Sequence, residues 1–250
     1  GSLISSFKKM ESLEFGENFE HFMSALSLKK CSNDFAKCYL INYLNQVIYN
    51  KMISRNINLR PNDITSIKNY YNPSQYKKRL NKPEGDIVLK NIKRLNPILP
   101  FVTHDIMASY KLFNKLSLNI KFIEIYRNPF ELTYSWYKRN LAKNLEYSRR
   151  SFTLKVKHKN KVYPWYLNNL PKNWNKFNDK EKCALYVIHQ TQRSVQQHRK
   201  IKNKNFLYTT TYRDITENTH FELKKIAKFL KTKLSDKTKN IIRKKNCPNF

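Results

Sequence analysis

An arginine and a serine spaced eight residues apart are the side chains of this sequence best suited to bind an anion. Arg127 follows the apolar run at residues 120–126, and Ser135 lies in the stretch after it. A guanidinium presents a planar set of donors, and a hydroxyl two turns into a helix can reach the same oxygens. Free backbone N–H groups at a helix start also attract phosphate. The pair therefore predicts an anion-binding corner.

Two elements must position this pair, a strand before the arginine and a helix after it. The β-branched and aromatic residues at 120–126 are typical of a parallel strand covered on both faces. Asn128 as a cap, Pro129 at the first helical position and Glu131 three residues after the cap predict a helix that starts at about Pro129. Ligands of open α/β sheets bind beyond such strand ends. An ordinary strand–helix corner, with the serine packed as a small residue, is the alternative.

A histidine at the end of another apolar run is the candidate for a proton acceptor. Residues 98–102 lead into Thr103-His104, and Asp105 opens a predicted helix that runs through Leu116. An imidazole can take a proton from a hydroxyl or an amine near neutral pH. The alternative is a structural histidine that caps or packs at the strand end.

The composition limits the class of protein and of partner. A length of 250 residues with 40% hydrophobic residues is enough for one globular α/β domain. The net charge of +31, from 49 Lys and Arg against 18 Asp and Glu, predicts anionic partners. Nucleic acid, anionic membrane, acidic glycan and nucleotide all fit this charge. Richness in Lys, Asn and Ile is also what a biased genome composition would produce.

The cysteines and the apolar runs indicate the cellular compartment of the protein. The four cysteines, Cys31, Cys38, Cys183 and Cys247, show no CxxC spacing and no metal-ligand cluster, so we expect no metal. Cys31 and Cys38 are spaced to share one helix face as core residues. The simpler interpretation is a reduced, soluble, cytoplasmic chain without a signal peptide. A membrane anchor upstream of Gly1 stays open.

Periodicity divides the rest of the chain into helices, loops and short strands. The spacing predicts two helices within 17–54, a polar loop at 55–84 and a short strand at 86–89 opened by Gly85. It also predicts a hairpin at 151–167, a helix at 179–201, a strand at 205–211 and helices at 221–230 and 236–245.

The predicted hairpin is the candidate for recognising an acceptor molecule. Lys159-Asn160 forms its turn, and basic residues alternate with Tyr163, Trp165 and Tyr166. Such aromatic rings could stack on a sugar or a base while the cations pair with its charges. A hairpin that covers the core is the alternative.

Three segments in a fixed order resemble the sulfotransferases that use 3′-phosphoadenosine 5′-phosphosulfate (PAPS). They are Thr-His ending at His104, Arg-Asn-Pro starting at Arg127 with its Ser135, and Tyr-x-Asp starting at Tyr212 before a helix that ends in Phe-Leu. The interval from His104 to Arg127, 23 residues, is similar to that of the cytosolic members. The resemblance covers residues 97–230.

The resemblance implies a fold and a set of roles. The fold is α/β, with a central parallel sheet flanked by helices as in P-loop nucleotide-binding proteins, and residues 1–250 form a single domain. Arg127 and Ser135 would bind the 3′-phosphate of the nucleotide, Tyr212 would approach the adenine, and His104 would act as the catalytic base. Some carbohydrate sulfotransferases use a glutamate instead, so a carboxylate base stays open.

The first residues have two interpretations. Gly1 and Ser2 resemble the end of the family's phosphate-binding loop, with Ser2 touching the 5′-phosphate, or they are a cloning remnant. In either case we expect the N-terminal strand and most of the phosphate loop to be missing, which puts the activity of this chain as it stands in question.

The function implied by the resemblance is sulfuryl transfer from PAPS to a hydroxyl or amine, leaving adenosine 3′,5′-bisphosphate (PAP) as product. The basic charge suggests a glycan or another anionic acceptor. A non-catalytic, basic nucleic-acid-binding protein is the alternative function. A P-loop kinase is disfavoured because GxxxxGK[ST] does not occur. The acceptor and the oligomeric state are not indicated by the sequence.

Overall fold

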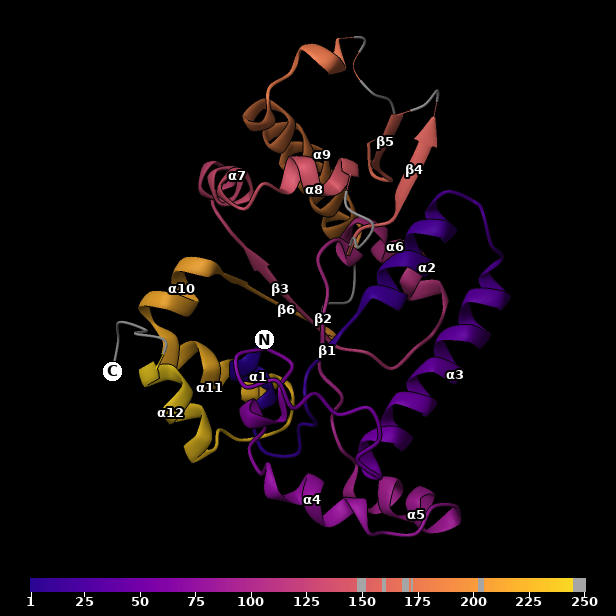
Figure 1. Cartoon of the computed structure of the whole chain (residues 1–250), viewed down its shortest axis with the longest axis vertical. Helices are drawn as coiled ribbons and strands as arrows, with labels where there is room; N and C mark the ends of the chain where they lie inside the picture. The colour runs from indigo at the N-terminus through magenta and orange to yellow at the C-terminus, as the bar shows by residue number, and fades with distance from the viewer. Residues whose placement is uncertain (148–151, 159–160, 168–170, 172, 202–204, 245–250) are drawn as a thin grey trace. The chain divides into compact units, whose positions relative to one another are not determined.

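Helices make up most of the computed structural model, which describes residues 1–147, 152–158, 161–167, 171, 173–201 and 205–244 (Figure 1). The α-helices are α1 (Ser2–Ser5), α2 (Glu17–Ser27), α3 (Asn33–Met52), α4 (Ser74–Leu80), α5 (Asp86–Leu95), α6 (Tyr110–Lys115), α7 (Pro129–Lys138), α8 (Leu141–Tyr147), α9 (Asp179–Arg199), α10 (Tyr212–Glu217), α11 (Thr219–Phe229) and α12 (Asp236–Lys244). Short 3₁₀ helices are η1 (Ile67–Asn69), η2 (Ile106–Ser109) and η3 (Trp174–Lys176). The strands are β1 (Glu14–Phe15), β2 (Phe101–Val102), β3 (Phe122–Tyr126), β4 (Lys155–His158), β5 (Lys161–Pro164) and β6 (Leu207–Thr211).

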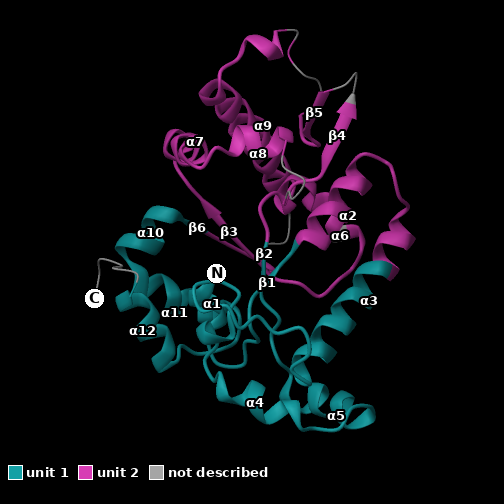
Figure 2. Ribbon diagram, viewed as in Figure 1, with its two compact units in different colours: residues 1–16, 39–102, 210–250 teal, residues 17–38, 103–209 magenta. Residues whose placement is uncertain are grey.

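The chain divides into two compact units, coloured separately in Figure 2. Unit 1 contains residues 1–16, 39–102 and 210–250, and unit 2 contains residues 17–38 and 103–209. The boundaries fall within α3 and within β6, so each of these elements contributes residues to both units.

The strands pair in three ladders within this helical framework. β1 and β2 are parallel, with Glu14 opposite Phe101, and a parallel bridge from Met10 to Ile98 extends their pairing. β3 pairs with β6, and β4 pairs with β5 in an antiparallel hairpin. Parallel strands flanked by helices confirm the predicted α/β class, and in the described residues each ladder has two strands.

Two segments differ from the sequence prediction in unit 1. The stretch predicted as a strand at 86–89 is the start of helix α5, and the predicted loop at 55–84 contains η1 and α4. A short apolar run fits a strand or a helix equally well. The helix is favoured because Ile92 continues the apolar spacing and packs with Val88 against Met52. Gly85, at φ 89°, supplies the backbone turn before it.

The core of unit 2 is aromatic and includes the hairpin. Tyr163, Trp165 and Tyr166 are at most 7% exposed and pack in one cluster with Trp174 and Tyr186. The prediction that these hairpin rings stack on an acceptor is therefore wrong, because burial against α8 and α9 leaves no ring face for a ligand. The hairpin itself is confirmed. Its predicted turn, Lys159-Asn160, lies outside the described residues.

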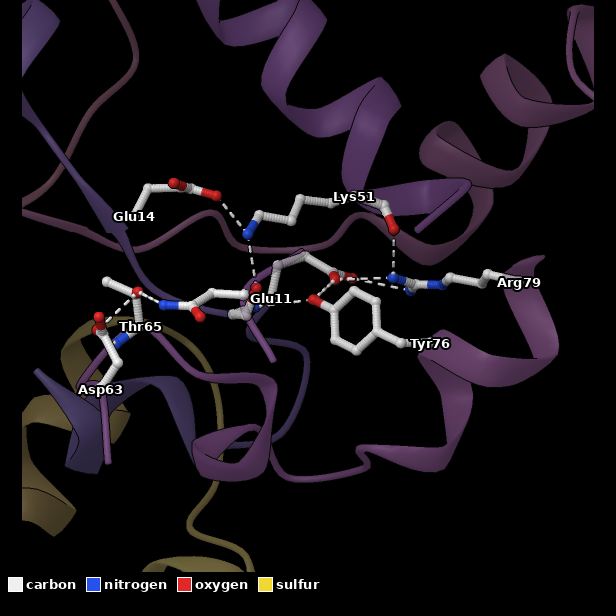
Figure 3. A network of polar contacts seen from close by, with 9 residues as sticks. Glu11, Glu14, Lys51, Asp63, Thr65, Tyr76 and Arg79 are labelled. Carbon is white, nitrogen blue, oxygen red and sulfur yellow. Dashed lines mark hydrogen bonds and ion pairs between the residues drawn. The ribbon is translucent and has the colours of Figure 1, made fainter. Parts of the chain in front are cut away.

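Unit 1 contains a buried network of charged and polar side chains (Figure 3). Glu11 accepts two hydrogen bonds from the Arg79 guanidinium, at 2.8 and 2.9 Å, and one of 2.6 Å from the Tyr76 hydroxyl. Arg79 also donates to the backbone carbonyl of Lys51 at 3.0 Å. The Lys51 ammonium in turn donates to the Ser12 hydroxyl at 2.6 Å. These bonds join α3, α4 and the segment before β1.

Two of the cysteines are placed differently from the sequence prediction. Cys183 is buried, but Cys38 is exposed and Cys31 precedes α3, so the predicted shared core face is wrong. Cys247 lies outside the described residues. Within the described ranges, we find no helix with the length and apolar character needed to cross a bilayer.

Candidate functional site

The corner between β3 and α7 forms as the sequence predicts. The Asn128 side chain accepts a hydrogen bond of 2.9 Å from the N–H of Phe130, and Pro129 occupies the first helical position. This cap fixes the start of α7, so Arg127 stands immediately between strand and helix, as Figure 1 shows for the β3–α7 connection. Ser135 lies in the second turn and is half-buried.

A carboxylate shares this corner with the arginine. Arg127 Nε lies 3.3 Å from Glu131 Oε2, and the arginine side chain is 30% exposed. Glu131 and Ser135 lie one turn apart on α7, and Arg127 precedes the N-cap, with its side chain reaching Glu131. An anion bound by Arg127 would therefore have to share the guanidinium with Glu131.

The candidate base, His104, rests on a buried glutamate that the sequence analysis missed. Glu20, from α2, has a side chain with 0% exposure, and its Oε1 accepts the backbone N–H groups of His104 and, at 3.0 Å, of Asp105. Its Oε2 lies 3.4 Å from Nδ1 of the His104 ring. The ring stacks on Phe152 with centroids 4.0 Å apart and keeps 35% exposure. Glu20 thus fixes both the backbone and the ring of His104.

The arrangement leaves Nε2 as the ring nitrogen that can accept a proton from an acceptor molecule. A proton on Nδ1, directed toward Glu20, leaves the lone pair on Nε2. The Gln190 side chain also donates to the His104 carbonyl at 2.6 Å, so α9 holds the same segment from another side. Burial raises the pKa of Glu20, while the hydrogen bond and the charge of His104 oppose that rise. A histidine–carboxylate pair of this kind can accept and stabilise a proton.

A second buried carboxyl group lies next in the chain. Asp105 is 2% exposed, and its Oδ2 accepts a hydrogen bond of 2.8 Å from the indole N–H of Trp165. The Arg193 guanidinium lies 4.7 Å above the Trp165 ring. Burial, followed by the charge of Glu20, raises the pKa of Asp105 to about 7.

This raised pKa makes the stability of unit 2 depend on pH. Between about pH 4, where an unfolded aspartate titrates, and about pH 7, the folded state binds more protons than the unfolded state, so stability falls as pH rises. We expect Asp105→Asn to remove this part of the decline while keeping an acceptor for Trp165. Urea unfolding at pH 5 to 8, monitored by tryptophan fluorescence, measures how the stability of unit 2 changes with pH, because all three tryptophans lie in unit 2. Asp179→Asn, at a partly exposed aspartate of the same unit, is the control and should keep the wild-type slope.

Another histidine–carboxylate pair joins α9 to β3. His198 Nδ1 lies 3.0 Å from Glu124 Oε2 and 3.2 Å from the Tyr126 hydroxyl. Glu124 and Tyr126 share one face of the strand, whereas Ile125 on the other face is 51% exposed. The prediction of an apolar strand covered on both faces is therefore wrong. This pairing fixes β3, the strand that Arg127 follows.

The predicted residues of unit 1 lie at two helix starts. Ser2 begins α1 and is buried, and the carbonyl of Gly1 accepts the N–H groups of Ile4 and Ser5. Tyr212 begins α10 and is 44% exposed. The structure thus assigns His104, Arg127 and Ser135 to unit 2, and Gly1, Ser2 and Tyr212 to unit 1. In the described ranges no group of three or more His, Cys, Asp or Glu side chains is placed to hold a metal ion.

Comparison with known proteins identifies the family. No curated protein and no solved structure matches the chain. The sequence model of the sulfotransferase domain matches residues 4–247, a range that includes α7 and its corner, His104 and Tyr212. The match extends over nearly the whole chain, from α1 past the end of α12, and the chain therefore belongs to the sulfotransferase domain family.

Proposed function

We propose that this sulfotransferase transfers a sulfuryl group from PAPS to a hydroxyl or amine acceptor and releases PAP. The observation that carries the proposal is the family match over residues 4–247, because it spans the β3–α7 corner, where Arg127 precedes the helix and Ser135 lies in its second turn. A sulfotransferase needs a nucleotide site and a proton acceptor, and this chain offers a candidate for each.

The nucleotide site centres on the corner. Arg127 would pair with the 3′-phosphate through its planar donors, and Ser135 would donate its hydroxyl to the same group. For Tyr212, Gly1 and Ser2, which belong to unit 1, contacts with the adenine and the 5′-phosphate stay predictions from the family resemblance. The ion pair between Arg127 and Glu131 opposes anion binding, so Glu131 would weaken the site that the arginine provides.

The transfer itself needs in-line geometry and one proton acceptor. The acceptor oxygen or nitrogen bonds to sulfur as the bond from sulfur to the oxygen of the 5′-phosphate breaks, and PAP leaves with that oxygen. Nε2 of His104 takes the acceptor's proton. The Glu20 carboxylate, fully buried behind the ring, holds Nδ1 and stabilises the imidazolium that forms. Because Glu20 is fully buried behind the ring, it acts on the acceptor's proton through His104.

We expect Arg127→Ala to weaken PAP binding by about 2 kcal/mol, roughly thirtyfold, because a charge-assisted contact to the 3′-phosphate is lost. Calorimetric titration of PAP into wild type and variant measures the loss. Glu131→Gln, at the ion-pair partner of Arg127, is the matched control, and it should bind PAP at least as tightly as wild type because the competing carboxylate is gone.

AMP, which has no 3′-phosphate, distinguishes this proposal from the alternative of general nucleic-acid binding, which the charge of +31 favours. A 3′-phosphate site keeps a preference for PAP over AMP at 150 mM salt, whereas attraction by net charge falls steeply with salt. Equal binding of PAP and AMP, or equal binding by wild type and Arg127→Ala, would contradict the assigned site.

A further inference from the structure

Four lysines lie among the residues that line a groove between α11 and α12 in unit 1. Its volume is about 540 Å³, within the range of ligand pockets. Lys224 and Lys228 lie one turn apart on α11, Lys233 lies on the connection, and Lys239 lies on α12. Against these four exposed lysines the groove has one acidic residue, Asp236, which lies 3.5 Å from Lys239. Four positive charges and one negative charge leave a net charge of +3.

Hydrogen bonds to the first residues of the chain fix the connection that forms part of this groove. The Ser235 hydroxyl donates to the carbonyl of Ser6 at 2.6 Å, and the N–H of Lys8 donates to the carbonyl of Lys233 at 2.9 Å. The Thr232 hydroxyl donates to the carbonyl of Lys8. These bonds order the backbone in the absence of a ligand, so binding does not have to pay that ordering cost.

The side chains favour a polysaccharide over a single-stranded nucleic acid. Proteins that bind single-stranded nucleic acid without sequence preference combine cations with aromatic rings that stack on bases. Among the described residues that line the groove, the only ring is the imidazole of His220. The oxygens of Thr232, Ser235 and Asp236 can instead accept hydrogen bonds from sugar hydroxyls, while the ammonium groups pair with sulfates or carboxylates.

We propose that the α11–α12 groove binds an anionic polysaccharide that carries sulfate or carboxylate groups. Lys224, Lys228, Lys233 and Lys239 pair with its charges, and the hydroxyls between them contact the sugar rings. Binding at this groove does not require the nucleotide site. That the bound chain is also the acceptor of the reaction rests on the proposed sulfotransferase function.

The test measures binding of a fluorescein-labelled heparin octasaccharide by anisotropy at 150 mM NaCl. We expect the variant with Lys224, Lys228, Lys233 and Lys239 all replaced by Gln to bind at least about tenfold more weakly than wild type, because fixed cations that pair with the ligand are lost. The matched control replaces four exposed lysines on α4 and α5 of the same unit, and should change affinity by less than about twofold. The control positions are Lys77, Lys78, Lys90 and Lys93.

The two variants remove the same total charge, so equal losses would overturn the proposal in favour of diffuse attraction. Absence of octasaccharide binding by wild type, or displacement by single-stranded DNA of equal charge at equal concentration, would also overturn it. Thermal unfolding checks the fold. If the fourfold variant unfolds, the pairs K224Q/K228Q and K233Q/K239Q replace it, each with an expected loss of about threefold. PAP binding should be unchanged in the groove variant, which separates this result from the nucleotide site.

Discussion

Replacing His104 by alanine should lower kcat for sulfuryl transfer by about 10²–10⁴-fold, the usual contribution of a positioned general base. His104 is 35% exposed, with its Nδ1 facing the buried Glu20, so the ring presents Nε2 to an acceptor. PAP affinity should not change, because the proposed nucleotide contacts come from other residues. Release of PAP from PAPS, with the acceptor that gives the highest wild-type rate among phenols, amines and oligosaccharides, measures the effect.

Two further variants separate the roles of His104 and its carboxylate. Glu20→Gln keeps a side chain that can accept the backbone N–H groups but removes the charge that stabilises an imidazolium. Its kcat should therefore fall by about tenfold or more, and the kcat of His104→Ala should fall further. His189→Ala, at a half-buried histidine on α9, is the control and should retain wild-type kcat. If Glu20→Gln abolished turnover and His104→Ala did not, the assignment of His104 as the base would be wrong.

Replacing Arg79 by alanine should destabilise unit 1 by about 3–5 kcal/mol. Arg79 and Glu11 have side chains with 4% and 2% exposure, and removing the arginine leaves the Glu11 carboxylate buried without its cation. The three tryptophans lie in unit 2, so urea unfolding should be followed by far-ultraviolet circular dichroism and by amide exchange of unit 1 rather than by tryptophan fluorescence.

An exposed pair of the same residue types provides the control. Arg55 lies 2.6 Å from Glu84, with side chains that are 50% and 56% exposed, and Arg55→Ala should cost about 1 kcal/mol or less. Replacing both buried partners, as Glu11→Leu with Arg79→Met, should recover part of the stability lost in Arg79→Ala, since no charge then stays unpaired. Equal effects of Arg79→Ala and Arg55→Ala would show that burial does not govern the contribution of the pair.

The features that the sequence predicted correctly depend on neighbouring residues. Asn128 and Pro129 specify the start of α7 through a cap and a fixed φ angle, and both act within one turn. Arg127 and Ser135 therefore reach the corner whatever the rest of the chain does. The hairpin and the long helix α9 were predictable for the same reason, because alternation and helical spacing are local patterns.

Which side chains are buried was harder to predict from the sequence than where helices and strands lie. The rings of Tyr163 and Trp165 look the same in sequence whether they cover a core or face a ligand, and packing against α8 and α9 decided that they are buried. The run from Ile87 to Leu89 fits a strand or a helix until its contacts with the end of α3 are known. The local sequence pattern predicts secondary structure but does not show which distant residues will pack against a given side chain.

The sequence by itself determined the family segments and the strand–helix corner at Arg127, and it singled out His104 as a candidate base, because each is a short run of residues with its own chemistry. Only the tertiary structure paired Glu20 with His104 across 84 positions, Arg79 with Glu11 across 68, and the lysines of α11 with those of α12. The two carboxylate pairs form because buried charges must find partners, and which partner is within reach depends on how the whole chain folds.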